Sequence, residues 1–167
     1  MVHSGSSRKL TAFIAERTPD VFAVSEIQPG DALAIATRFA RQWAYRGRQA
    51  LFWNARLTPV EIVDQYLPPA AFANRRGLIV VRGSIDGRAC SVAVTHLHAA
   101  RSRRIPELRF LRTMLRSQSG PAVLFASLPP GRIGVRDLGF REARAQTPEV
   151  WIREFESGAV CAGALKV

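Results

Sequence analysis

The clearest pattern in the chain is a set of short apolar runs with few polar interruptions, each of which predicts a strand buried on both faces. These runs are residues 21–26, 49–54, 77–85, 88–96 and 121–127. Asp86 and Gly87 separate the third run from the fourth, and an Asp-Gly pair is typical of the tight turn of an antiparallel hairpin. A shorter run at 43–46 and a closing hairpin formed by 150–156 and 159–167 complete the expected strands.

Other segments repeat their apolar residues with the period of a helix. The first has Ser6 or Ser7 as its N-cap, and its apolar face consists of Leu10, Phe13 and Ile14. Further helices are expected at about 32–42 and 103–118, with a short one possible at 59–66. Helices interspersed with both kinds of strand pairing predict an α/β (α+β) sheet sandwich.

Length and composition predict one domain that spans residues 1–167. The chain has 167 residues, of which 47% are hydrophobic, and this is enough for one substantial core. No apolar run approaches the roughly 18 residues of a membrane span. The start, MVHSGSSRKL, lacks the apolar core of a signal peptide, so we expect a cytoplasmic protein if Met1 is the true start. Cys90 and Cys161 lie in expected strands and predict buried free thiols, since no zinc-ligand spacing is present.

The chain is strongly basic, with a formal net charge of +11. Such a surface attracts phosphate groups, which makes nucleic acid or another phosphate ester a candidate partner. Arginines concentrate behind the sequence THLH, and among them Arg101 and Arg104 are candidate phosphate contacts. A solvated basic helix face explains the same cluster equally well, and the alternative therefore stays open.

Side chains that could take part in catalysis or metal binding stand at the ends of two apolar strands. Glu26 ends the run VFAVSE, while His96 and His98 follow the run CSVAVT. The carboxyl ends of buried strands form the rim at which α/β active sites lie, so these side chains are candidate site residues. A solvated strand end for Glu26, and a turn hydrogen bond for each histidine, are the alternatives.

The order of these motifs resembles the endonuclease/exonuclease/phosphatase superfamily over nearly the whole chain. The matching stretches are PDVFAVSEI (19–27), GLIVV followed by RACSVAVTHLH, and GPAVLFASLP (120–129). The family pattern has an Asn on its first strand, then PDvvalQE, THL, GDFN and a closing Asp-His. The resemblance implies a four-layer αββα sandwich, with two mixed β-sheets inside and helices outside. It also implies hydrolysis of phosphoesters with Mg²⁺, or Mn²⁺, as the cofactor.

Carried over residue by residue, the resemblance assigns Glu26 to the metal and His96 to the scissile phosphate, with His98 assisting. The remaining positions depart from the family: its Asn falls on Met1, its Gln on Ser25, and GDFN reads Ala-Ser-Leu-Pro at 126–129. Its closing Asp-His falls near 149–152, where the residues are Glu-Val-Trp-Ile. Each lost base or oxyanion donor typically costs about 10² to 10⁴ in rate.

We therefore expect a catalytically impaired or inactive member that serves as a binding or structural module for phosphate-bearing ligands or a protein partner. An active Mg²⁺-dependent phosphodiesterase or nuclease is the alternative, with Asp137 or Glu149 as substitute ligands, and a nucleic-acid-binding protein without catalysis is a third. Because Met1 falls on the family's Asn, the first strand is expected to be missing or truncated. Such a gap leaves an unpaired sheet edge, which a terminus of the same chain, a second copy or a protein partner could fill.

Overall fold

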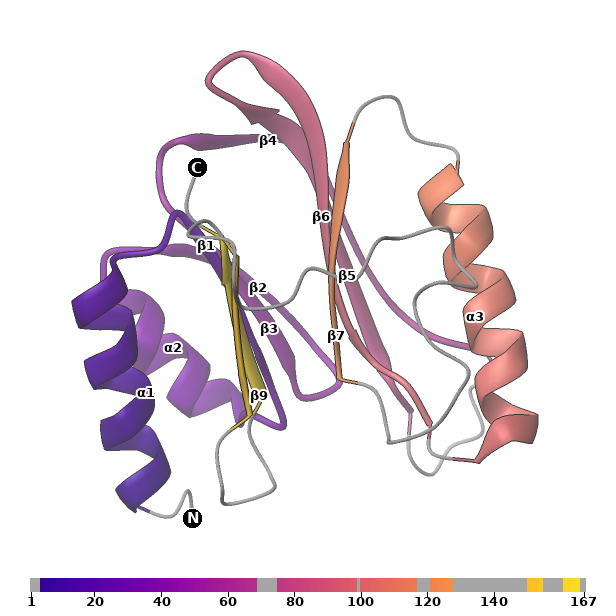
Figure 1. Cartoon of the computed structure of the whole chain (residues 1–167), viewed down its shortest axis with the longest axis horizontal. Helices are drawn as coiled ribbons and strands as arrows, with labels where there is room; N and C mark the ends of the chain where they lie inside the picture. The colour runs from indigo at the N-terminus through magenta and orange to yellow at the C-terminus, as the bar shows by residue number, and fades with distance from the viewer. Residues whose placement is uncertain are drawn as a thin grey trace.

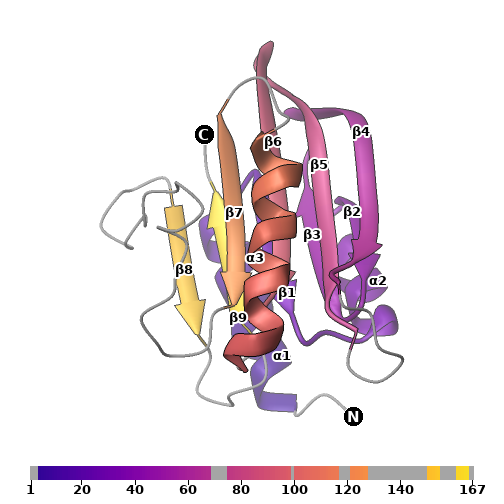
Figure 2. The ribbon, with the colours of Figure 1, turned by 90° about the vertical axis from the view of Figure 1, so that its right-hand side faces the viewer.

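A computed structural model describes residues 4–68, 75–98, 100–116, 121–127, 150–154 and 161–165. Two β-sheets pack face to face, and helices cover their outer faces (Figure 1). The helices are α1 (Ser4–Arg17), α2 (Pro29–Arg38) and α3 (Arg101–Arg116). Both α1 and α2 lie on one sheet, and α3 runs along the outer face of the other, as the turned view in Figure 2 also shows. This arrangement confirms the expected four-layer αββα sandwich.

The two sheets differ in how their strands pair. The first has the order β2-β3-β1-β9-β8, with antiparallel pairing throughout. Its strands are β1 (Val21–Ser25), β2 (Gln42–Arg46), β3 (Gln49–Trp53), β8 (Val150–Glu154) and β9 (Cys161–Leu165). The second has the order β4-β5-β6-β7, and its last pair, β6 and β7, is parallel and joined through α3. Its strands are β4 (Leu57–Tyr66), β5 (Gly77–Ile85), β6 (Arg88–His96) and β7 (Ala122–Ser127).

Three apolar cores separate the four layers. Because successive side chains of a strand point to opposite faces, Phe22 and Val24 of β1 pack toward α1 and α2, whereas Val21 and Ala23 face the second sheet. The core between the sheets adds Leu51, Trp53, Ile79, Val81, Val92 and Val94. The third core packs the inner face of α3 on β5 and β6 through Leu108, Leu111 and Leu115. Runs that are apolar at every position are therefore explained by burial on both faces.

Several element boundaries differ from the sequence-based expectation. Residues 59–66 belong to strand β4, not to a short helix, and β4 pairs with β5 along its whole length. Strand β4 is an edge strand and has a bulge between Pro59 and Glu61. Both features explain why the missing N–H of Pro59 is tolerated. Helix α2 ends at Arg38, before residue 42, and α1 begins at Ser4, so Ser6 and Ser7 lie within the helix.

The expected open edge is not present on β1. Strand β1 pairs with β3 on one side and with β9 on the other, so this central strand has no unpaired side. Where the structure describes the first sheet, its outermost strands are β2 and β8. The pairing with β9 agrees with the alternative that a terminal segment fills the gap left by the missing first strand, and it gives no support to a second copy or protein partner there. None of the helices in the described ranges is long and apolar enough to cross a membrane.

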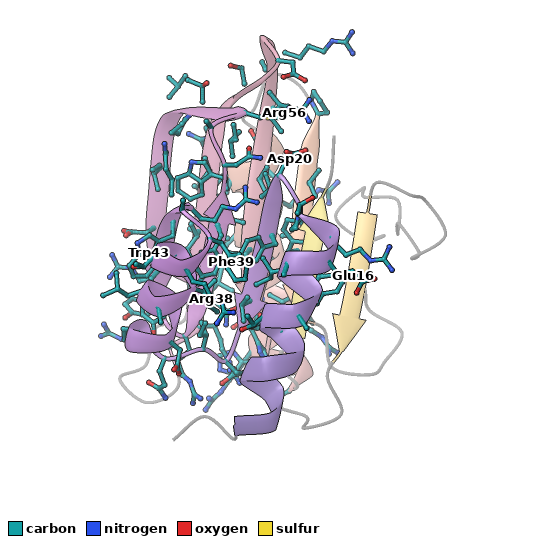
Figure 3. The ribbon with its side chains drawn as sticks, turned by 90° about the vertical axis from the view of Figure 1, so that its left-hand side faces the viewer. Glu16, Asp20, Arg38, Phe39, Trp43 and Arg56 are labelled. Atoms are coloured by element: carbon teal, nitrogen blue, oxygen red, sulfur yellow. The ribbon has the colours of Figure 1, made fainter. Side chains whose placement is uncertain are left out.

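Polar contacts at one end of the sandwich anchor the start of β1. The buried carboxylate of Asp20 accepts hydrogen bonds from Asn54 Nδ2 at 2.7 Å and from Arg56 Nη1 at 3.0 Å. Figure 3 shows Asp20 and Arg56 together at this upper end. Since β1 runs away from Asp20, its carboxyl end and Glu26 lie at the opposite, lower end of the sandwich.

Candidate functional site

The lower rim brings together residues from four segments. Glu26 follows β1, His96 ends β6, Arg48 lies in the turn between β2 and β3, and Arg76 directly precedes β5. The same rim holds the loop from β6 to α3, because β6 runs toward it and α3 leads away from it (Figure 1). Two of the four, Glu26 and His96, are residues that the sequence singled out.

A close backbone approach places the two arginines at the rim. The turn between β2 and β3 consists of Gly47 and Arg48, both with positive φ, of 54° and 67°. This turn packs against the start of β5 so tightly that a Cβ atom on Gly77 would lie 1.9 Å from the carbonyl oxygen of Arg46. Only glycine fits there, and the contact holds Arg48 and Arg76 beside each other.

The carboxylate of Glu26 is shared among three basic side chains. Oε1 accepts a hydrogen bond from Arg76 Nη1 at 3.2 Å, and Oε2 forms an ion pair with Arg48 Nε at 3.3 Å. His96 Nδ1 also lies 3.2 Å from Oε1, but without hydrogen-bond geometry. The Glu26 side chain is 20% exposed, and its backbone has a φ of 61°, an uncommon conformation for a residue with a side chain. Such strain often marks functional positions.

The environment of His96 favours the neutral imidazole. Burial is the main reason that the pKa of His96 lies below its ordinary value, and the positive charge of Arg76 lowers it further. Glu26 opposes both effects, and the nearby His98 adds a smaller lowering. The ring is 23% exposed, and Nδ1 is its buried nitrogen, so the ring meets solvent through the opposite edge. An uncharged ring beside Arg48, Arg76 and Glu26 leaves the cluster with a net charge of about +1.

The described residues do not fit a divalent cation at Glu26. Mg²⁺ is held through carboxylate oxygens, and both oxygens of Glu26 are already paired with guanidinium groups. Across the described ranges, no three His, Cys, Asp or Glu side chains come together as a metal site would need. Two fixed positive charges beside the carboxylate also repel a cation.

His98 lies next to this cluster but is bound to helix α3. Its backbone N–H donates to Glu107 Oε2 at 2.9 Å, and its ring Nδ1 contacts Glu107 Oε1. Glu107 is 1% exposed, and the remaining ring nitrogen of His98, Nε2, is buried without a partner. The geometry makes the pair an anchor between α3 and the end of β6.

The other candidate positions from the sequence are either buried or outside the described residues. Arg104 lies on the inner face of α3, 7% exposed, with a buried Nε that has no partner. The side chain of Arg101 lies outside the described residues, as do Asp137, Glu149 and the residues at 128–129. Ser25, at the family's Gln position, is buried and donates its hydroxyl hydrogen to Gln49 Oε1 at 2.6 Å.

Sequence reasoning missed Arg48, Arg76 and Glu107. The first two stand next to Gly47 and Gly77, but the sequence does not show that these glycines pack against each other. Glu107 lies in a helix with many charged residues, and nothing in its spacing from His98 distinguishes it from a solvated side chain.

Comparisons with known proteins identify the fold through structure alone. No protein-family model matches the sequence, and no curated protein matches it. A zebrafish TDP2 structure in complex with a single-strand DNA product has a TM-score of 0.62 and 16% identity, covering 87% of this chain and 60% of that one. The mannosyl-6-phosphatase Bt3783 of Bacteroides thetaiotaomicron has a TM-score of 0.64 and 9% identity, covering 95% and 76%.

A third similar structure carries the superfamily name. It is an endonuclease/exonuclease/phosphatase family protein from Bacteroides thetaiotaomicron, with a TM-score of 0.62, 14% identity and coverage of 72% of this chain and 52% of that one. The chain spans about 60% of the length of the TDP2 structures that it resembles. Together with the layer order and the rim of β1 and β6, these similarities show that the chain has the endonuclease/exonuclease/phosphatase superfamily fold.

Proposed function

We propose that this chain is a phosphate-binding domain of the endonuclease/exonuclease/phosphatase type in which metal-dependent hydrolysis is impaired or lost. The observation that carries the proposal is the pairing of Glu26 with Arg48 and Arg76. A side chain that would hold a metal in an active relative is here neutralised by the protein's own cations. The described part of the rim keeps a net positive charge, which attracts a phosphate and repels a metal ion.

Unpaired nitrogens at the rim support an anionic ligand. Gln49 Nε2, Arg76 Nε and His96 Nδ1 are buried there without hydrogen-bond partners. Amide and guanidinium N–H groups are donors, and unpaired buried donors often mark a place where an ion or a water molecule binds. Phosphate oxygens accept hydrogen bonds from such groups, whereas a metal ion cannot satisfy them.

The similar structures support phosphate esters as the class of ligand. One of the TDP2 structures is a complex with a single-strand DNA product, and Bt3783 is a mannosyl-6-phosphatase, which acts on a sugar 6-phosphate. Both molecules carry phosphate esters. For this chain we infer binding to nucleic acid or to another phosphate ester, with Arg48, Arg76 and His96 as the contacts and His98 as a structural anchor.

Binding and hydrolysis can be tested in the same sample. A fluorescently labelled single-stranded oligonucleotide should bind with an affinity that falls as salt rises, because phosphate contacts release counterions. The double substitution Arg48→Gln/Arg76→Gln should weaken binding at least about tenfold. Arg38→Gln/Arg88→Gln, which removes two exposed arginines away from the rim, is the charge-matched control. Hydrolysis of the oligonucleotide with 5 to 10 mM Mg²⁺ or Mn²⁺ should stay at background.

An active Mg²⁺-dependent phosphodiesterase or nuclease is the second candidate, favoured by the 3.2 Å approach of Glu26 to His96 at the rim. This function requires that a metal ion or the substrate phosphate displaces Arg48 and Arg76 from the Glu26 carboxylate. Hydrolysis that depends on Mg²⁺ or Mn²⁺ and disappears in Glu26→Gln would establish this second function and refute the first.

A further inference from the structure

We propose that Glu26 is a built-in competitor for the phosphate group: its carboxylate occupies the donors of Arg48 and Arg76 in the free protein and is displaced when a phosphate binds them. This inference rests on the proposed phosphate binding at the rim. It reverses the role that the family resemblance gives to Glu26, because a carboxylate that recruits a cation assists phosphate binding, whereas a carboxylate that holds the arginines opposes it.

The contacts of Glu26 are those that an incoming phosphate would make. One carboxylate oxygen accepts from Arg76 Nη1 and the other pairs with Arg48 Nε, so the carboxylate bridges two guanidinium groups from different segments. Phosphate presents negatively charged oxygens at a similar separation, and arginine binds carboxylate and phosphate with the same fork of N–H donors. The two anions therefore compete for one set of donors.

The backbone allows this exchange without a change of fold. Ile27 N–H donates to the carbonyl oxygen of Arg48 at 3.2 Å, which fixes the chain after Glu26 against the turn that carries Arg48. The close packing of Gly47 and Gly77 fixes Arg76 on the other side. Only side-chain torsions of Glu26 need to change for its carboxylate to leave, and 20% of this side chain is already exposed.

The remaining donors explain why the site prefers phosphate to a single carboxylate. Arg48 is 54% exposed and pairs with Glu26 through its Nε, so much of its guanidinium-bearing side chain is accessible to a ligand. Arg76 has a buried Nε without a partner. A tetrahedral anion has more oxygens than Glu26 has, so it can satisfy more of these donors at once.

The proposal predicts that removing the negative charge of Glu26 strengthens phosphate binding. Glu26→Gln keeps the size of the side chain but no longer pairs electrostatically with the arginines. For a partly exposed pair at this distance, we expect the dissociation constant of phosphate to fall by about 3- to 10-fold. Glu61→Gln is the matched control, because Glu61 is an exposed acid of β4 that is paired with one arginine, Arg82, on the neighbouring strand β5 and away from the rim. Its effect should stay below about twofold.

The experiment is a titration of the ¹⁵N-labelled full chain with inorganic phosphate at constant ionic strength, followed by amide and arginine side-chain NMR shifts. A 5′-phosphorylated dinucleotide provides a second arm, which distinguishes free phosphate from a nucleic-acid source, and acetate tests the preference for a tetrahedral anion. Glu26→Ala repeats the measurement if Glu26→Gln does not give a native spectrum. Tighter phosphate binding in the Glu26 variants, lost again on adding Arg48→Gln/Arg76→Gln, is the expected result.

Two other outcomes would each decide a different question. If the wild type binds phosphate and the Glu26 variants bind it equally or more weakly, Glu26 is not a competitor, while the proposed phosphate binding stands. Titration up to about 50 mM ligand would detect a site with a dissociation constant in the millimolar range. If neither the wild type nor any Glu26 variant binds phosphate or the dinucleotide in this range, the proposed function fails together with the inference.

Discussion

Removal of the Glu107 carboxylate should weaken the whole domain, because this side chain fastens α3 to the end of β6. In the structure Glu107 accepts the backbone N–H of His98 at 2.9 Å and contacts the ring Nδ1 of the same residue. Only 1% of the Glu107 side chain and 13% of the His98 side chain are exposed. Water cannot replace the lost acceptor without opening the packing of α3.

The expected magnitude follows from these contacts. Each buried donor that loses its acceptor costs about 1 to 3 kcal/mol, and Glu107→Ala leaves two such donors on His98. We therefore expect the free energy of unfolding to fall by about 2 to 5 kcal/mol, which for a chain of this size corresponds to a Tm lower by about 4 to 20 °C. Glu107→Gln keeps one acceptor oxygen and should lose roughly half as much.

A double-mutant cycle separates the pair from its surroundings. Urea unfolding, followed by circular dichroism, gives the stability of the wild type, Glu107→Ala, His98→Ala and the double variant. We expect a coupling energy of at least about 1 kcal/mol, because each single change removes the same contacts. Additive effects within about 0.3 kcal/mol, or a loss below about 0.5 kcal/mol for Glu107→Ala, would refute the anchoring role of this pair.

Two further predictions test the geometry and the charge of the rim. Gly77→Ala should lower the free energy of unfolding by about 3 kcal/mol or more, because its Cβ would overlap the carbonyl oxygen of Arg46. Gly30→Ala is the control, and because Gly30 has open space around it, the change should stay below about 1 kcal/mol. Urea unfolding measures both. The pKa of His96, followed by NMR, should lie below its ordinary value and fall further in Glu26→Gln, and a pKa above the ordinary value would contradict the described environment. Because the unfolded chain then binds the proton more readily, stability should decrease as pH falls from about 6.5 through the folded pKa, and less so in His96→Asn.

The sequence predicted most strands because burial on both faces leaves a direct trace. The runs around Val21 and Val92 have apolar side chains at nearly every position, and the Asp86-Gly87 turn has the two positive φ angles that its residues favour. Strand β4 was missed because it lies at an edge and alternates exposed and partly buried positions. Its Val60 and Ile62 are exposed, so hydrophobicity there does not report burial.

Half of the rim cluster could be predicted, and the other half depends on contacts distant in sequence. Glu26 and His96 each follow or end a buried strand, and the carboxyl ends of such strands form the rim of α/β sites, so the sequence predicts that the two residues lie close together. Arg48 and Arg76 reach Glu26 only because a two-residue turn packs against the start of β5, 30 residues later in the chain. A chain with 24 basic residues offers many possible partners for each acid, so the sequence alone cannot select these two.

The charge balance of the rim gives a physical reason for the proposed change of ligand on a retained fold. In the described part of the chain, Glu26 belongs to no group of three potential metal ligands, and a single carboxylate holds Mg²⁺ poorly because the ion demands several oxygen ligands. Arg48, from the turn between β2 and β3, and Arg76, from just before β5, neutralise the same carboxylate, and no metal ion has to lose its water shell for this. Their combined charge exceeds that of Glu26, so the field that would have gathered a cation now gathers an anion. We therefore propose that a phosphate binds at this rim without a metal and that its competitor there is Glu26, the residue to which the family resemblance assigns the metal.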